Sequence, residues 1–304
     1  MKKSIDTHLD FSFEKNPDKE FLRRALGRIS LSGVQEKFSA VIDGGKFRLA
    51  RDGEQGTWIL KPAPMDLTLD GRKHVPVNEY ITMTIARRLY GIVTAEVLLC
   101  EDSSGQNVLA VRRFDVQPDG RKLPQEDFAS VLGRSGTEPG GIFKYTGDYA
   151  EIAAAIRRYI SAWPPAVEDF FRLVLFNYIY ANGDAHLKNF SILRQGPEYI
   201  LAPAYNLLNT ELHIKGCDFA LSGGLSQDLV LSDIYSTSGH PCRADFEQFG
   251  EIIGLKPPRI KKVISQFMAL PEEVGMLLRQ SPFPDKMQRS YLRIIKERLA
   301  RINR

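Results

Sequence analysis

The stretch Asn182-Gly-Asp-Ala-His-Leu-Lys-Asn-Phe190 is the most informative part of this 304-residue chain. It is a polar loop that follows a helical pattern over 167–181 and precedes the apolar run 190–193. A turn at 195–197 separates that run from a second one at 199–202, which predicts a β-hairpin directly after the loop. The sequence thus places polar and ionisable residues between a helix and a hairpin.

Asp184 and Asn189 have the Asp-x4-Asn spacing of kinase catalytic loops. In such loops the carboxylate accepts the proton of the substrate hydroxyl, and the amide oxygen binds Mg²⁺ without adding charge repulsion against the phosphates. The spacing alone is common by chance, and an ordinary surface loop with capping residues has the same letters. The rest of the chain has to decide between these two interpretations.

Two upstream residues favour the catalytic interpretation. Lys61 ends a predicted strand at 58–61, from which its amino group can reach phosphate oxygens. Glu79 lies in the first turn of a helix predicted over 78–90, with Asn78 as its cap, and can hold that lysine. Each residue alone reads as a solvated surface charge, but the order strand lysine, helix glutamate and Asp-x4-Asn indicates a phosphotransferase.

The pattern of the chain changes near residue 115. Residues 1–115 read as strands and turns, including a hairpin at Asp43-Gly-Gly-Lys46 and a strand pair at 95–100 and 108–114. Residues 116–304 contain helical stretches at 151–160, 167–181, 245–253, 258–268 and 287–302. We therefore expect an α+β, two-lobed protein-kinase-like fold, with a β-rich N-lobe over 1–115 and a mostly helical C-lobe over 116–304.

Composition excludes several classes of protein. The chain is 43% hydrophobic and 26% charged, which are globular values, and its net charge of +4 establishes no nucleic-acid footprint. Three widely spaced cysteines predict no disulfide framework and fit a reduced cytoplasm. No apolar run is long enough for a secretion signal or a membrane span. Four residues could be imagined as zinc ligands, but their spacing matches no zinc module: His186, Cys217, His240 and Cys242.

Seven segments in family order resemble the HipA family of serine/threonine kinase toxins, and within it the short HipT toxins of tripartite systems. They are Ser30-Leu-Ser-Gly-Val-Gln-Glu-Lys37, Ile59-Leu-Lys-Pro62, Val77-Asn-Glu-Tyr80, Leu109-Ala-Val-Arg-Arg-Phe-Asp115, Leu123-Pro-Gln-Glu-Asp127, the loop 182–190 and Leu201-Ala-Pro-Ala-Tyr205.

The resemblance implies a cytoplasmic, ATP- and Mg²⁺-dependent kinase of a toxin–antitoxin system. Its implied substrate is an aminoacyl-tRNA synthetase, with the tryptophanyl enzyme favoured and the glutamyl enzyme next, and its implied effect is translation arrest and dormancy. The implied partners are a HipB-like antitoxin with a helix-turn-helix and a small HipS-like protein resembling the N-terminal subdomain of longer toxins. The antitoxin, and not this chain, would bind DNA, and no membrane is an expected partner.

Carried over by position, the resemblance also assigns residue roles. Asp184 would be the catalytic base, supported by Lys61, Glu79 and Asn189, and the metal would be held by Asn189 and Asn206. Autophosphorylation is implied at Ser30 and Ser32. The implied nucleotide-binding residues are Leu31, Ser32, Gly33, Val34, Lys37, Lys61, Arg112, Arg113, Phe114, Asp115 and His186.

Position 206 departs from the family pattern, which has a metal-binding aspartate after Leu201-Ala-Pro-Ala-Tyr205. An amide oxygen lacks the charge that holds hard divalent cations, so metal affinity and rate should suffer. We interpret Asn206 as a substitution that inactivates a toxin for expression; the alternative is a natural, weakened variant.

Two other function classes stay open at this point. One is a non-catalytic ATP-binding regulatory subunit with a native Asn206, and the other is a small-molecule kinase, against which the Ser-x-Ser loop argues. The basic segment 286–304 carries seven Lys or Arg against one Glu. This segment is predicted to be a helix that docks through its apolar stripe and leaves its basic face in solvent. The alternative is that the basic face contacts nucleic acid.

Overall fold

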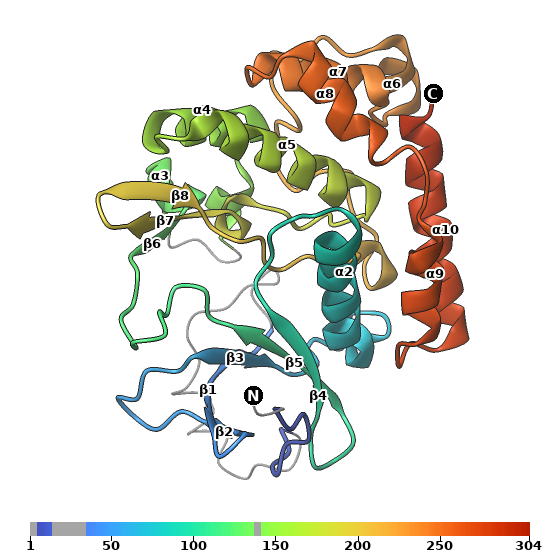
Figure 1. Ribbon diagram of the computed structural model, residues 1–304. Coiled ribbons are helices and arrows are strands. Elements are labelled where there is room, and N and C mark those ends of the chain that lie inside the picture. Colours follow the sequence, from blue (N-terminus) through green and yellow to red (C-terminus); the bar gives the residue numbers. More distant parts are fainter. Residues whose placement is uncertain (1–4, 14–34, 137–140) are drawn as a thin grey trace.

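The computed structural model describes residues 5–13, 35–136 and 141–304, with a five-stranded sheet at one end and most helices at the other (Figure 1). The sheet is antiparallel, in the order β2-β1-β3-β5-β4. The predicted hairpin is confirmed, because Asp43 pairs with Lys46 across two glycines of positive φ. The strands are β1 (Phe38–Asp43), β2 (Lys46–Leu49), β3 (Trp58–Lys61), β4 (Val97–Glu101) and β5 (Asn107–Arg112).

Helix α2 (Val75–Leu89) lies between this sheet and the C-terminal helices (Figure 1). The prediction of a helix over 78–90 was wrong by three residues at its start, because Pro76 is tolerated in a first helical turn. Asn78 is therefore not a cap, and Glu79 lies in the second turn. The Asn78 side chain is buried and brackets the Asn209 backbone, donating to its carbonyl oxygen at 2.8 Å and accepting from its N–H at 3.0 Å.

A second antiparallel sheet, in the order β6-β7-β8, supports the predicted polar loop. Its hairpin consists of β7 (Ser191–Gln195) and β8 (Glu198–Leu201), as the sequence predicts. The edge strand β6 (Gln125–Asp127) was not predicted, since three residues are too few for a recognisable alternation. Asp127 then caps the short helix α3 (Phe128–Val131) through its side chain.

The remaining helices form the larger part of the molecule, around the buried helix α5. All five predicted helical stretches correspond to helices, with shifted ends. Helices α6 and α9 were not predicted, because helices of six and eight residues give a weak periodicity. The helices are α4 (Tyr149–Tyr159), α5 (Trp163–Ile179), α6 (Asp233–Ser238), α7 (Arg243–Ile252), α8 (Pro257–Ser265), α9 (Glu272–Arg279) and α10 (Asp285–Ile302).

Helix α10 is docked, as its apolar stripe predicts. Tyr291, Ile295 and Leu299 are buried, and the Tyr291 hydroxyl lies 2.7 Å from Thr82 Oγ1 of α2. Lys286, Arg289, Arg293 and Lys296 face solvent, whereas Arg298 is buried and Arg301 is half-buried. Among the described residues, no helix combines the length and the apolar character that crossing a membrane requires.

Candidate active site

The loop 182–189 leaves α5 through a tight local backbone. Gly183 lies so close to the chain at residue 217 that a Cβ on it would be 2.8 Å from the Cys217 carbonyl oxygen. A larger residue would have to displace that backbone, which explains the glycine. The Gly183 N–H also donates to Thr210 Oγ1 at 2.9 Å. The sequence Asn182-Gly-Asp therefore fixes Asp184 against the segment that follows the hairpin.

Asp184 is held through both its side chain and its backbone. The Tyr145 hydroxyl donates to Asp184 Oδ1 at 2.8 Å, and Asn189 Nδ2 donates to the Asp184 carbonyl oxygen at 2.6 Å. Burial and the nearby Asp184 carboxylate raise the pKa of Tyr145, so this hydroxyl remains a donor at neutral pH. The carboxylate thus keeps a fixed orientation while remaining partly exposed.

Lys61, at the end of β3, joins the sheet to the segment after the hairpin. Its Nζ lies 2.5 Å from Glu79 Oε1 of α2 and 2.7 Å from Asn206 Oδ1. The Lys61 and Glu79 side chains are only 5% and 1% exposed. A buried charge without its partner is costly, so each of these residues fixes the position of the other.

Asn206 completes a continuous polar chain. Its Nδ2 donates to Asn189 Oδ1 at 2.9 Å, and its backbone carbonyl oxygen accepts from Asn182 Nδ2 at 3.2 Å. Its φ of 56° is left-handed, a conformation that asparagine adopts more readily than most residues. The chain Glu79–Lys61–Asn206–Asn189 thereby ends on the Asp184 backbone, which unites residues that the sequence analysis had named separately.

These residues do not fit a divalent cation well. Asn189 and Asn206 offer two neutral amide oxygens, and each of these already accepts a hydrogen bond, from Asn206 Nδ2 and Lys61 Nζ respectively. Mg²⁺ is held in proteins chiefly by carboxylates together with phosphate oxygens. No group of three or more His, Cys, Asp or Glu side chains suited to a metal occurs among the described residues. The Mg²⁺ site therefore stays a prediction.

A cavity of about 650 Å³ opens beside Lys61 and Asn206, between the two sheets. Its size is typical of a cofactor site. Lys188 and Tyr205, which flank the hairpin in the sequence, also line the cavity, and the segment 122–127 forms another wall. The predicted nucleotide-binding residues that line it are Lys37, Lys61, Arg112, Arg113, Phe114 and Asp115.

The predicted nucleotide-binding segment 112–115 begins at the last residue of β5, and two of its side chains bind each other. Arg113 binds Asp115 through two nitrogens, at 3.0 and 2.6 Å. The Phe114 ring lies 5.6 Å from the Tyr205 ring, centroid to centroid, which gives the cavity an aromatic edge. The sheet and the hairpin therefore meet at this segment.

His186 and the serine loop differ from the other predicted residues. His186 is fully buried outside the cavity lining, against the Tyr145 ring at 5.1 Å, and its role in nucleotide binding stays a prediction. Burial and Lys144 lower the pKa of His186 to about 3, which keeps it neutral. Residues Ser30, Leu31, Ser32, Gly33 and Val34 lie outside the described residues.

Lys37 is the cavity cation whose charge is most sensitive to pH. Burial lowers its pKa to about 8, and the neighbouring Lys61 adds to this shift, while Glu79 opposes it. Lys144 and Lys188 also repel the charged form. A bound polyanion would favour charged Lys37 and so raise its pKa.

We expect nucleotide affinity to fall about tenfold between pH 7.5 and 9.5, because binding must then take up a proton at Lys37. Titration with a fluorescent ATP analogue at each pH measures this, and Lys37→Gln should give weaker binding with a nearly flat profile. An unchanged slope in Lys37→Gln would assign the pH dependence to another group.

Sequence reasoning missed two residues that organise the site. Tyr145 reaches Asp184 from 39 positions away, and no spacing in the sequence signals that contact. Asn78 was interpreted as a cap, although it connects α2 to Asn209. The signal for Asn78 was its place beside Glu79 within an otherwise apolar helical face.

Comparison with known proteins identifies the family of this chain. The model of the HipA-like C-terminal domain family matches residues 29–274, most of the chain. The chain belongs to this family. A protein of Sinorhizobium fredii named "Putative kinase Y4dM" is 36% identical over 215 residues, which are 64% of this chain and 48% of that protein. The chain thus spans about half the length of that relative.

Two solved structures share the fold. HipA of Shewanella oneidensis, solved with HipB and its operator DNA, aligns with a TM-score of 0.67 at 21% identity, over 90% of this chain and 64% of that chain. The Helicobacter pylori kinase CtkA aligns with a TM-score of 0.52 at 16% identity, over 87% of this chain and 93% of that chain. The predicted kinase-like α+β fold is confirmed.

Proposed function

We propose that this protein is an ATP-dependent serine/threonine protein kinase of the HipA toxin type. The observation that carries the proposal is the polar chain from Glu79 through Lys61, Asn206 and Asn189 to the Asp184 backbone, beside a cavity of about 650 Å³. A buried lysine, a fixed carboxylate and a nucleotide-sized cavity are three of the parts that kinases use in phosphoryl transfer.

The residues would act in transfer as follows. Lys61, which lines the cavity, would contact phosphate oxygens, and Lys37 and Lys188 would add positive charge there. Asp184, oriented by Tyr145, would accept the proton of the acceptor hydroxyl. The hydroxyl oxygen would then bond to the γ-phosphorus of ATP while the bond from that phosphorus to the leaving ADP oxygen breaks. Because the donor set fits Mg²⁺ poorly, no step is assigned to a metal.

The finer features of the function are part of the same proposal. An aminoacyl-tRNA synthetase, with the tryptophanyl enzyme ahead of the glutamyl one, is the proposed acceptor, and phosphorylation of Ser30 or Ser32 is the proposed self-modification. A HipB-like antitoxin is the proposed partner, supported by the complex in which Shewanella HipA was solved with HipB and operator DNA. A HipS-like protein is the second proposed partner.

A regulatory subunit that binds ATP without transferring phosphate is the second candidate. The hydrogen bond from Asn206 to Asn189 favours it, since two amides bonded to each other occupy the place where a metal-binding carboxylate is expected. The two candidates agree on nucleotide binding and differ in transfer.

We expect the chain to bind ATP and to lose most of that affinity when Lys61 is removed. Lys61→Ala alone would leave Glu79 buried without a counter-charge and would destabilise the fold. The informative variant is therefore Lys61→Met combined with Glu79→Gln, which removes both buried charges together, with the unaltered chain as the control. Calorimetric titration with ATP should show at least about tenfold weaker binding by the double variant than by the control. Equal affinities, or no binding by the unaltered chain, would contradict the proposal.

A further inference from the structure

Two neighbouring residues of α2 hold the segment that follows the hairpin. Glu79 reaches it through Lys61, whose Nζ lies 2.5 Å from Glu79 Oε1 and 2.7 Å from Asn206 Oδ1. Asn78 reaches it directly, because its amide brackets the buried Asn209 backbone at 2.8 and 3.0 Å. A shift of α2 would therefore change both contacts together, and with them the position of Lys61 in the nucleotide cavity.

His213 binds the second hydrogen of the Asn78 amide. Asn78 Nδ2 lies 2.9 Å from His213 Nε2. Because an amide nitrogen only donates, Nε2 has to be the unprotonated acceptor. The other ring nitrogen, Nδ1, then carries the hydrogen and donates to the Asp70 carbonyl oxygen at 2.7 Å. Both hydrogens of the Asn78 amide are thus used, one on Asn209 and one on His213, and the arrangement requires a neutral imidazole.

The surroundings of His213 favour this neutral form. Burial lowers the pKa of His213, and the neighbouring His74 acts in the same direction. Asp70 opposes the shift through its backbone and its carboxylate. These two residues are the charged or titratable groups that act on His213 among the described residues.

The buried hydrogen bonds continue from Asn78 to α10. Thr82, one turn further along α2, donates from Oγ1 to Asn78 Oδ1 at 3.2 Å. The Tyr291 hydroxyl of α10 lies 2.7 Å from the same Thr82 oxygen. All three residues are fully buried, so a bond lost here is not replaced by one to solvent. Helix α10 therefore supports α2 one residue away from Glu79.

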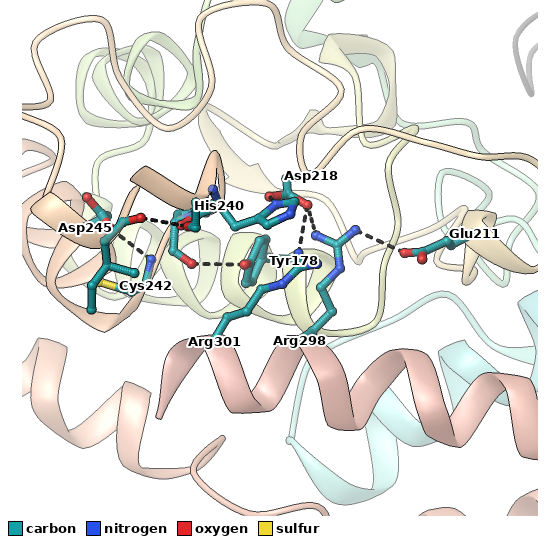
Figure 2. Close-up of polar contacts among 11 residues, drawn as sticks. Tyr178, Glu211, Asp218, His240, Cys242, Asp245, Arg298 and Arg301 are labelled. Atoms are coloured by element: carbon teal, nitrogen blue, oxygen red, sulfur yellow. Dashed lines mark hydrogen bonds and ion pairs between the residues drawn. The ribbon is translucent and has the colours of Figure 1, made fainter. Parts of the chain in front are cut away.

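The C-terminal part of α10 is anchored to the same stretch of chain that Asn78 holds (Figure 2). Arg298 and Arg301 point at Asp218 and bind its Oδ1. Arg298 also donates to Glu211 at 3.1 Å. Helix α10 thus contacts α2 at one place and the stretch containing Glu211 at another, while Asn78 joins α2 to that stretch. The three contacts form a closed ring, in which each element fixes the other two.

We propose that Asn78 is a positioning residue, which sets the place of α2 and so keeps Glu79 in contact with Lys61. This proposal rests on the proposed kinase function, because Lys61 is the residue that would bind the phosphates of ATP. Asn78 does not line the nucleotide cavity, so its effect on ATP is exerted through Lys61. Helix α10 supplies the outer support of this arrangement through Tyr291.

The test compares Asn78→Asp and Asn78→Ala with the unaltered chain by calorimetric titration with ATP, at a temperature at which circular dichroism shows every chain folded. The introduced carboxylate places an acceptor against the Asn209 carbonyl oxygen and His213 Nε2, and a proton taken up there restores one donor. Relative to the unaltered chain, Asn78→Asp should bind ATP at least about tenfold more weakly near pH 8.5 and within about threefold near pH 6.5. Asn78→Ala, which has no group to protonate, should show the same deficit at both pH values.

The outcomes separate this proposal from the kinase proposal. ATP affinities of the folded Asn78 variants equal to that of the unaltered chain would overturn the positioning role and leave the kinase proposal intact. A deficit of Asn78→Asp that does not change with pH would also overturn it, because the amide hydrogens would then not be the cause. Failure of the unaltered chain to bind ATP would count against the kinase proposal instead.

A second measurement needs no nucleotide. Tyr291→Phe removes the hydroxyl that supports Thr82, and Tyr180→Phe is the matched control, since the Tyr180 hydroxyl is also buried and bonds to Tyr90 at 3.0 Å. Hydrogen exchange of the amides 77–82, relative to those of α5, should be at least about threefold faster in Tyr291→Phe than in Tyr180→Phe. Equal exchange in the two variants would overturn the support of α2 by α10.

Discussion

Asn206→Asp is expected to raise phosphoryl transfer by about 100-fold or more, since a carboxylate that holds a metal contributes several kcal/mol of transition-state stabilisation. The new carboxylate would keep the contact with Lys61 Nζ, now 2.7 Å from the amide oxygen. It would lose the bond in which Asn206 Nδ2 donates to Asn189 Oδ1. Two acceptor oxygens would then face each other, and a cation between them would relieve their repulsion.

The measurement is radiolabelled transfer from ATP, with divalent cation affinity determined in parallel. The matched control is Asn206→Ser, which removes the amide without adding charge and should remain slow. Addition of EDTA should return the Asn206→Asp variant to the rate of the unaltered chain. Equal transfer by the unaltered chain and the Asn206→Asp variant would refute this account of position 206 and favour a metal site elsewhere.

Asp184→Asn in the Asn206→Asp background should lower transfer by about 10²–10⁴-fold, the usual contribution of a general base. Nucleotide affinity should stay within a few-fold, because Asp184 lies outside the lining of the nucleotide cavity. Single-turnover kinetics and calorimetric ATP titration separate these two effects.

Tyr145→Phe is the graded control for Asp184, because it keeps the carboxylate and removes only the hydrogen bond to Oδ1. Tyr145→Phe should lower the rate of phosphoryl transfer less than Asp184→Asn does, and it should leave ATP affinity unchanged. If Asp184→Asn weakens ATP binding as strongly as it slows transfer, Asp184 has a structural role instead.

The sequence predicted the parts of the site that neighbouring residues determine. The Asp-x4-Asn loop and its hairpin follow from local spacing, and Lys61 and Glu79 follow from their order on a strand and a helix. The start of α2 was misplaced because Asn78 has the residue type of a cap, whereas burial against Asn209 decides its role. That contact joins residues 131 positions apart, and residue type alone does not reveal it.

The hydrogen bonds and ion pairs between side chains could not be predicted from the sequence either, because they also join residues that are far apart along the chain. The hydrogen bond from Tyr145 to Asp184 and the Asp218 network with α10 depend on packing between distant segments. The departure at position 206 was visible from the sequence, but the bond from Asn206 to Asn189 was not. Helix α9 escaped prediction because its buried Val274 and Leu278 make only one helical repeat.

The left-handed backbone at residue 206 has an evolutionary consequence. Asparagine and aspartate both tolerate this conformation, whereas most other residues would be strained there. Their codons differ by a single base, and their side chains differ only in NH₂ against an oxygen. On the proposed function, one point mutation at this codon would separate an inactive kinase from an active one without straining the backbone at residue 206.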